Sequence, residues 1–268
     1  MNFMDFHCHL DDPAYDNTRS RIIHECFDSG FSAIVTVTDP CEIGSLEKTR
    51  DILKLHENIF CIIAIHPHHA DQYHPDIERA IISYVENQRA IAIGETGLDY
   101  HYNHSTPENQ LNVFKRQIAI AAELNLPLVI HAREAENRVL KILESEKFSL
   151  PVIFHCYSGS RDQAREILNR GYYISISGIV TFKKATELQD IVREIPLDRI
   201  FTETDSPYLS PDPFRGKVNN PLKVKLVAEK IAEIKGISVS KLNQAINNNF
   251  DHLFSKNNRF NTNNSYNF

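Results

Sequence analysis

Side chains that can bind metal stand repeatedly at the downstream ends of short apolar segments in this chain. His131 follows Pro127–Ile130, and His155 follows Pro151–Phe154 in the same way. Similar segments lead to the other members of the set, which are His7, His9, Glu95 and Asp205. Because the strands of a closed parallel barrel all end on one face, this pattern predicts a (β/α)8 TIM barrel. Its metal site should lie at the C-terminal face of the strands.

Eight short segments rich in β-branched and aromatic residues are predicted to be strands buried on both faces. They are Asn2–Phe6, Ala33–Thr38, Phe60–Ile65, Ala90–Gly94, Leu128–His131, Val152–His155, Tyr172–Ser177 and Ile200–Thr204. Helical patterns separate them, with starts expected after Thr106 and Ser160 and the last helix expected to end at Asn247–Asn249. This alternation indicates parallel strands with right-handed crossovers. Eight repeats favour closure, and an open doubly wound sheet is the alternative.

The 268 residues suit one domain, because an eight-fold barrel takes about 250 residues. We expect the barrel to span residues 1–256 and the asparagine-rich segment 257–268 to be a disordered tail. The net charge is −6 and no basic stripe is present, which disfavours tight binding of duplex DNA.

Five cysteines without a C-x-x-C spacing indicate reduced thiols in a cytoplasmic protein. Cys8 and Cys156 each neighbour a candidate ligand, and neighbours in a strand point to opposite faces, so both are expected to face the helix layer. The N-terminus does not resemble a signal peptide, and no segment approaches the roughly 18 apolar residues of a membrane span. We expect a monomer without a membrane partner.

His7 and His9 are two residues apart, so a strand would present both imidazoles on one face, with Asp5 deeper on that face. Such a pair is weakly specific alone, although stray polar groups are costly at the end of a buried strand. A lone glutamate after a strand is usually solvated, and a single buried histidine is usually a satisfied core residue. Six candidate ligands at five strand ends together favour a metal site.

The motifs around these residues resemble the TatD family of metal-dependent deoxyribonucleases in the amidohydrolase superfamily. The resemblance runs from Asn2 to about Phe254. It rests on Asp5–Leu10, Ile65–His68, Gly94–Tyr100, Leu126–Arg133, His155–Gly159, Gly178–Lys183, Thr202–Tyr208, Arg215 and Asn219–Pro221. Thr96 departs from the family pattern, where an apolar residue is common. Its side chain should point away from Glu95, so we expect no effect on function.

The resemblance implies two divalent ions per chain. The first would take His7, His9, Glu95 and Asp205, and the second Glu95, His131 and His155, with Glu95 as the bridge. Two such ions, about 3.5–4 Å apart, can activate a water and offset charge on a phosphoryl group. Nitrogen and oxygen ligands suit zinc, manganese, cobalt or magnesium. Asp205 is expected to orient the water and accept its proton, so it and Glu95 are the candidate catalytic residues.

Other side chains are weaker candidates. Glu203 shares the face of Asp205 and could hold a ligand imidazole, and Asp5, deeper on the face of His7 and His9, could support the site in the same way. Arg133 shares the face of His131 and could anchor a phosphate. The remaining candidates are either substrate contacts or ordinary polar and packing residues of the barrel mouth: His66, His68, Lys183, Arg215, Tyr100, Tyr157 and Tyr208.

The function expected from this pattern is a phosphodiesterase that cleaves DNA nucleotide by nucleotide from a 3′ end. A barrel mouth is a pit, which admits a single-stranded or frayed end better than a continuous duplex. One alternative is a small-molecule amidohydrolase or lactonase that uses the same ions on a carbonyl group. The other is a non-catalytic metal-binding scaffold, against which the complete ligand set counts.

Overall fold

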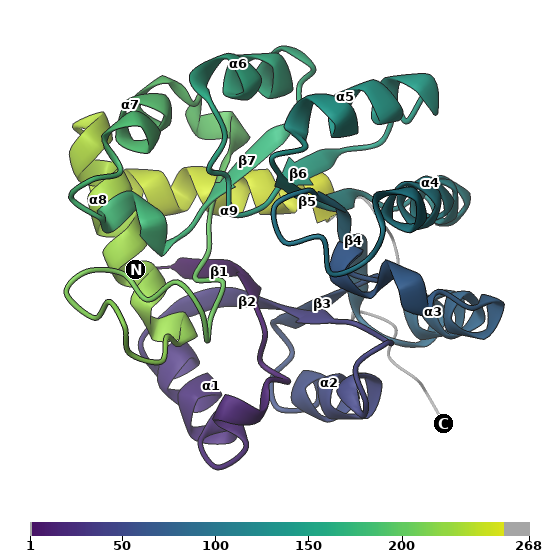
Figure 1. Ribbon diagram of the computed structural model, residues 1–268. Helices are drawn as coiled ribbons and strands as arrows, with labels where there is room; N and C mark the ends of the chain where they lie inside the picture. The colour runs from purple at the N-terminus through teal and green to yellow at the C-terminus, as the bar shows by residue number, and fades with distance from the viewer. Residues whose placement is uncertain (1, 255–268) are drawn as a thin grey trace.

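The computed structural model describes residues 2–254 and contains one eight-stranded parallel sheet in the order β1 to β8 (Figure 1). The strands are β1 (Phe3–Cys8), β2 (Phe31–Thr38), β3 (Ile59–Ile63), β4 (Ala90–Asp99), β5 (Leu128–Arg133), β6 (Val152–Phe154), β7 (Tyr173–Ile176) and β8 (Ile200–Thr202). A parallel bridge between Cys8 and Ser206 returns the sheet to β1. The predicted (β/α)8 barrel is confirmed, and the open sheet is excluded because β1 and β8 meet.

Nine α-helices of the described residues surround the strands (Figure 1). They are α1 (Arg19–Asp28), α2 (Ser45–Leu53), α3 (Pro75–Asn87), α4 (Pro107–Leu124), α5 (Glu136–Ser145), α6 (Arg161–Asn169), α7 (Thr186–Glu194), α8 (Val224–Lys235) and α9 (Val239–Phe254). Short 3-10 turns η1 (Pro13–Tyr15), η2 (Pro67–Gln72), η3 (Gly178–Thr181), η4 (Leu197–Arg199) and η5 (Pro221–Lys223) lie in the connections. Within residues 2–254, every helix is too short or too polar to cross a bilayer.

The start signals read from the sequence are confirmed for two helices. The Thr106 hydroxyl accepts a hydrogen bond from the Asn109 amide at the start of α4. Ser160 and Gln163 form a capping box at the start of α6. The predicted end of α9 at residues 247–249 is wrong, since the Asn249 side chain donates to two backbone carbonyls, at Leu197 and Ile200, and the helix continues. The expected tail, residues 257–268, and its boundary at residue 256 lie outside the described residues.

β4 is longer than expected and continues past Gly94 to Asp99. Gly97 pairs with His131 there, and a Cβ atom at this glycine would overlap the His131 carbonyl oxygen. Its φ of 142° is also open to glycine far more readily than to other residues. Gly97, three residues beyond the predicted end of the strand at Gly94, is thus the point where β4 and β5 approach closely, and β4 continues through it to the barrel mouth.

The side chain of Gln117 on α4 forms hydrogen bonds with β4 and with the segment that follows β3. Its side-chain oxygen accepts from the Ile65 amide at 2.7 Å, and its amide nitrogen donates to the Ile65 carbonyl at 3.0 Å and to the Thr96 hydroxyl at 2.7 Å. Thr96 therefore points to the helix layer and away from Glu95, as expected. All three residues are buried.

Replacing Gln117 with Met should lower the free energy of unfolding by about 2–4 kcal/mol, because it leaves several buried polar groups unpaired at about 1–3 kcal/mol each. Urea denaturation at a fixed metal concentration measures the change. Lys115→Met on the exposed side of the same helix is the control and should cost less than about 1 kcal/mol, since it breaks only a surface ion pair with Glu146. Equal stability of the two variants would contradict this account.

Candidate metal centre

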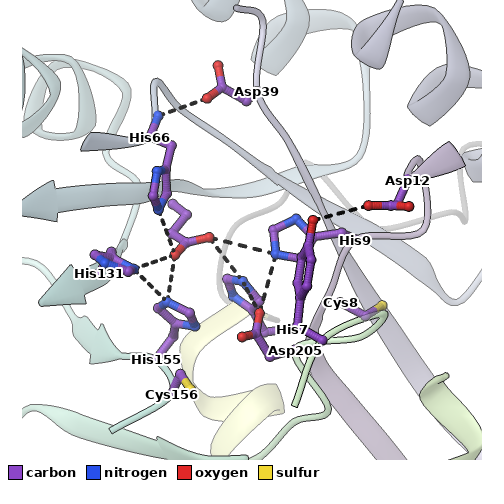
Figure 2. A network of polar contacts seen from close by, with 12 residues as sticks. His7, Cys8, His9, Asp12, Asp39, His66, His131, His155, Cys156 and Asp205 are labelled. Atoms are coloured by element: carbon purple, nitrogen blue, oxygen red, sulfur yellow. Dashed lines mark hydrogen bonds and ion pairs between the residues drawn. The ribbon is translucent and has the colours of Figure 1, made fainter. Parts of the chain in front are cut away.

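Glu95 lies at the centre of a group of five imidazoles at the C-terminal mouth of the barrel. Its side chain comes from β4 and is 4% exposed. Its oxygens lie 2.6 Å from His155 Nε2, 2.8 Å from His131 Nδ1, 3.2 Å from His7 Nε2, 3.3 Å from His66 Nε2 and 4.0 Å from His9 Nε2. Figure 2 shows these rings converging from different strands. The structure thus brings together the five predicted ligands other than Asp205, and adds His66.

Asp205 completes the set from the segment after β8. Its carboxylate lies 3.3 Å from His9 Nε2 and 3.8 Å from His7 Nε2 (Figure 2). Its backbone is in the left-handed region at φ 53°, and its amide donates to the His7 carbonyl at 2.9 Å. Closure of the barrel between β8 and β1 therefore holds Asp205 beside the two histidines of the first strand.

The side chains present fit divalent ions. Both ring nitrogens of His7 and Nδ1 of His155 are buried and make no well-aligned hydrogen bond, although carboxylate oxygens lie 3.2 Å from His7 Nε2 and 3.4 Å from His155 Nδ1. The two rings stack at 4.0 Å. Buried imidazole nitrogens left in this way are costly unless something binds them. His7, His9 and Glu95 form one group that could hold an ion, and Glu95, His131 and His155 form another. The set of residues that bind metal and the number of ions remain predictions.

The electrostatics favour anionic carboxylates at this centre. Burial opposes ionisation of Glu95, but the facing imidazoles, led by His155, hold its pKa well below the usual range. Burial likewise opposes ionisation of Asp205, and the contact with His9 lowers its pKa overall. Burial lowers the pKa of His66 to about 4. At neutral pH the centre thus offers two charged carboxylates. The neutral His66 ring accepts from the His68 amide at Nδ1, at 3.1 Å, so its Nε2 carries the hydrogen and faces Glu95 as a donor.

Asp99, which the sequence reasoning did not single out, orients His131. Its Oδ2 lies 3.0 Å from His131 Nε2 and 2.8 Å from His68 Nε2. Burial opposes its ionisation, but hydrogen bonds led by that from His131 hold the pKa of Asp99 well below its usual range. A ring that donates its Nε2 hydrogen to Asp99 presents the Nδ1 lone pair toward Glu95, as a metal ligand must. Alternation along β4 places Asp99 on the same face as Glu95. Sequence reasoning missed Asp99 because the predicted strand ended at Gly94.

Two further buried carboxylates support the centre from beneath. Glu203 lies 3.4 Å from His155 Nδ1 and accepts from the Cys156 amide at 2.7 Å, and its role in holding a ligand imidazole stays a prediction. Asp5 instead accepts from the backbone and hydroxyl of Thr204, at 2.8 and 2.6 Å. It therefore secures the chain just before Asp205.

The weaker candidates divide into two groups. His66, His68, Arg133 and Tyr208 line a pocket of about 640 Å³ above the centre. Tyr157 does not, because it is buried and its hydroxyl donates to the Ser160 carbonyl. Lys183, Arg215 and Tyr100 are not among the lining residues either. The Arg215 guanidinium packs over the Phe182 ring, and Tyr100 packs against the core.

The placement expected for the cysteines is confirmed for Cys8 and wrong for Cys156. Cys8 is buried, with its thiol 3.5 Å from the Val35 carbonyl. Cys156 lines the pocket, with its sulfur 3.2 Å from the Ser177 hydroxyl. β6 ends at Phe154 and Cys156 has φ 44°, so the alternation of a strand does not extend to it. All five cysteines are free.

Comparison with known proteins agrees with this geometry. Residues 4–255 match the family model for TatD-related DNases. The chain belongs to this family. It is 38% identical to the uncharacterized metal-dependent hydrolase YcfH of Escherichia coli K12, over 95% of this chain and 96% of YcfH. It is 31% identical to the 3′-5′ ssDNA/RNA exonuclease TatD of Shigella flexneri, over 93% and 98% of the two chains.

A solved structure shows the same fold. The crystal structure of YJJV, a TatD homologue from E. coli K12, superposes with a TM-score of 0.87 at 23% identity, covering 94% of this chain and 98% of YJJV. Family membership and the clustered ligands together identify this TatD-family protein as a metal-dependent hydrolase.

Reconstitution with manganese or zinc should load up to about two equivalents per chain, and Glu95→Ala should lose most of both, because both groups use this carboxylate. His131→Ala should lose about one. Elemental analysis of desalted protein measures the content. His24→Ala, an exposed histidine on α1, is the matched control and should load like the parent. Less than half an equivalent in folded parent protein would rule out the two-ion centre.

Proposed function

We propose that this TatD-family hydrolase is a 3′-5′ exodeoxyribonuclease that cleaves single-stranded or frayed DNA ends. The observation that carries the proposal is the pair of ligand groups sharing Glu95 at the floor of a pocket. Two adjacent divalent ions are a common device for phosphodiester cleavage. The exonuclease name of the Shigella relative supports the same substrate class.

In this proposal His7, His9, Glu95 and Asp205 hold one divalent ion and Glu95, His131 and His155 hold the other, as Mg, Mn or Zn. Bound ions would supply Lewis acidity to a water and to the phosphoryl oxygens. Asp205 accepts the proton of the attacking water at its carboxylate, which the contact with His9 keeps anionic. Asp99 and Glu203 hold the rings of His131 and His155 in place.

The pocket favours an end of a strand over its middle. A volume of about 640 Å³ accommodates a nucleotide or two but not a duplex. The net charge of −6 disfavours extended contact with a polyanion, so binding would be confined to the mouth. We propose that the chain acts on DNA as a monomer.

End-labelled single-stranded DNA with a free 3′ hydroxyl should shorten from that end when divalent metal is present, and a chelator should stop the reaction. Gel analysis of 5′-labelled substrate gives the product ladder, with 3′-phosphorylated DNA, duplex DNA and circular single strands for comparison. Equal cleavage of circular and linear strands would refute the exonuclease assignment. Faster turnover of an ester and lactone panel than of DNA would favour a small-molecule hydrolase.

Asp205→Asn tests the proton acceptor. The amide keeps the shape and one oxygen ligand but loses the charge and basicity, so the variant should retain at least one ion and lose about 10²–10⁴-fold in single-turnover cleavage. Metal content measured on the same samples separates this loss from that of Glu95→Ala, which should also lose metal. Cleavage within a few-fold of the parent would assign the proton to another residue, with Glu203 the next candidate.

A further inference from the structure

The loop that follows β4 presents an aromatic side chain at the rim of the pocket. Tyr102 is 51% exposed although it lines the pocket with His104 and Arg133. The Arg133 guanidinium lies over the Tyr102 ring at 4.7 Å. The His104 ring is almost parallel to it, at 12° with the centroids 5.7 Å apart. That separation means offset stacking, which leaves ring surface open. The three planar groups form what we call the rim stack.

The rim stack is fastened to the metal centre through Asp99. Oδ1 of Asp99 accepts from the backbone amides of His101 and Tyr102, at 3.0 and 2.9 Å. Its other oxygen, Oδ2, contacts the predicted ligand His131. Gln110 donates to the Ser105 carbonyl and holds the far end of the loop. One buried carboxylate thus fixes both the imidazole of His131, a predicted ligand, and the loop that carries Tyr102, so the rim stack has a defined position relative to the candidate metal centre.

Charge is distributed unequally around the pocket mouth. Asp11, Asp39 and Glu42, which follow β1 and β2, line one side. Arg133, at the end of β5, lies across the barrel from them, because the strands are ordered β1 to β8 around the sheet. Burial is the main cause that raises the pKa of Glu42, and repulsion from Asp11 and Asp39 adds to it. His69 pairs with Asp39 at 2.7 Å, so Asp11 and Glu42 are the acids of the β1–β2 side that repel an anion, while Arg133 attracts one on the β4–β5 side. A polyanion would therefore follow the β4–β5 side.

We propose that the rim stack is the docking site for the polynucleotide strand that continues from the scissile phosphate. A base would stack on its planar groups, and Arg133 would pair with a backbone phosphate. The inference rests on the proposed nuclease function. It adds the side of the pocket mouth over which the polynucleotide leaves and the residues that bind the polynucleotide there.

Tyr102→Ala tests the rim stack with two substrates, a single-stranded 12-mer and the p-nitrophenyl ester of thymidine 5′-monophosphate, which has no further strand. The ratio of kcat/KM for the 12-mer to that for the ester should fall by about 5- to 100-fold, mostly through KM, as expected for loss of one stacked base. Tyr102→Phe should restore the ratio. Tyr73→Ala, which removes a part-exposed tyrosine outside the pocket, is the matched control.

Arg133→Ala gives a second readout. The slope of log KM for the 12-mer against log salt should decrease by about 0.7, the value for one phosphate contact on a single strand. An unchanged ratio in Tyr102→Ala, or an equal loss on both substrates, would overturn the rim stack as a strand site. If the parent cleaves neither DNA nor the ester, the proposed function itself is overturned and the rim stack with it. If the parent and Tyr102→Ala cleave the 12-mer and the ester with the same kcat/KM values, the rim stack is overturned and the proposed function is not.

Discussion

Burial of the Glu95 carboxylate is the constraint on which the site depends. A carboxylate at 4% exposure has lost most of its hydration, a cost of several kcal/mol that must be offset locally. Here the offset comes from five imidazoles, which reach it from β1, from β5 and from the segments that follow β1, β3 and β6. Only the shared end of a closed parallel barrel brings side chains from so many strands to one carboxylate. Closure of the barrel is therefore a condition for the chemistry.

A layer of buried carboxylates behind the centre makes its geometry specific. Asp5 holds the backbone at Thr204, Asp99 holds the ring of His131, and Glu203 lies against His155. Buried carboxyl groups of this kind are weak contributors to stability, and apolar replacements often fold as well or better. Their presence is better explained by the need to fix ring orientation and the free nitrogen of each imidazole, which apolar packing cannot do.

The sequence was sufficient for the barrel and for the convergence of the predicted ligands, because a polar residue that ends a buried apolar run, such as His131, is costly unless it has a partner. The sequence was insufficient where a strand or helix extends beyond, or stops short of, the residues that its apolar pattern indicated. The predicted strand ended at Gly94, whereas β4 continues through Gly97, where it touches β5, and so Asp99 was missed. Cys156 lies beyond the last strand residue, so alternation gave it the wrong face. Asn249 continues α9 because distant carbonyls accept from its side chain.

Substrate choice must come from the rim, since the metal centre can polarise many kinds of ester. The rim of this chain is asymmetric, with acids after β1 and β2 and Arg133 beside an exposed aromatic side chain after β4 and β5. A small neutral substrate gains nothing from such a field. A polynucleotide carries a negative charge at every phosphate. The acids on one side of the mouth repel it and Arg133 on the other side attracts it, so the field favours one direction in which it leaves the pocket. In the proposed nuclease function, an end bound in that direction would place its terminal phosphodiester over Glu95, which is the geometry that stepwise removal of nucleotides requires.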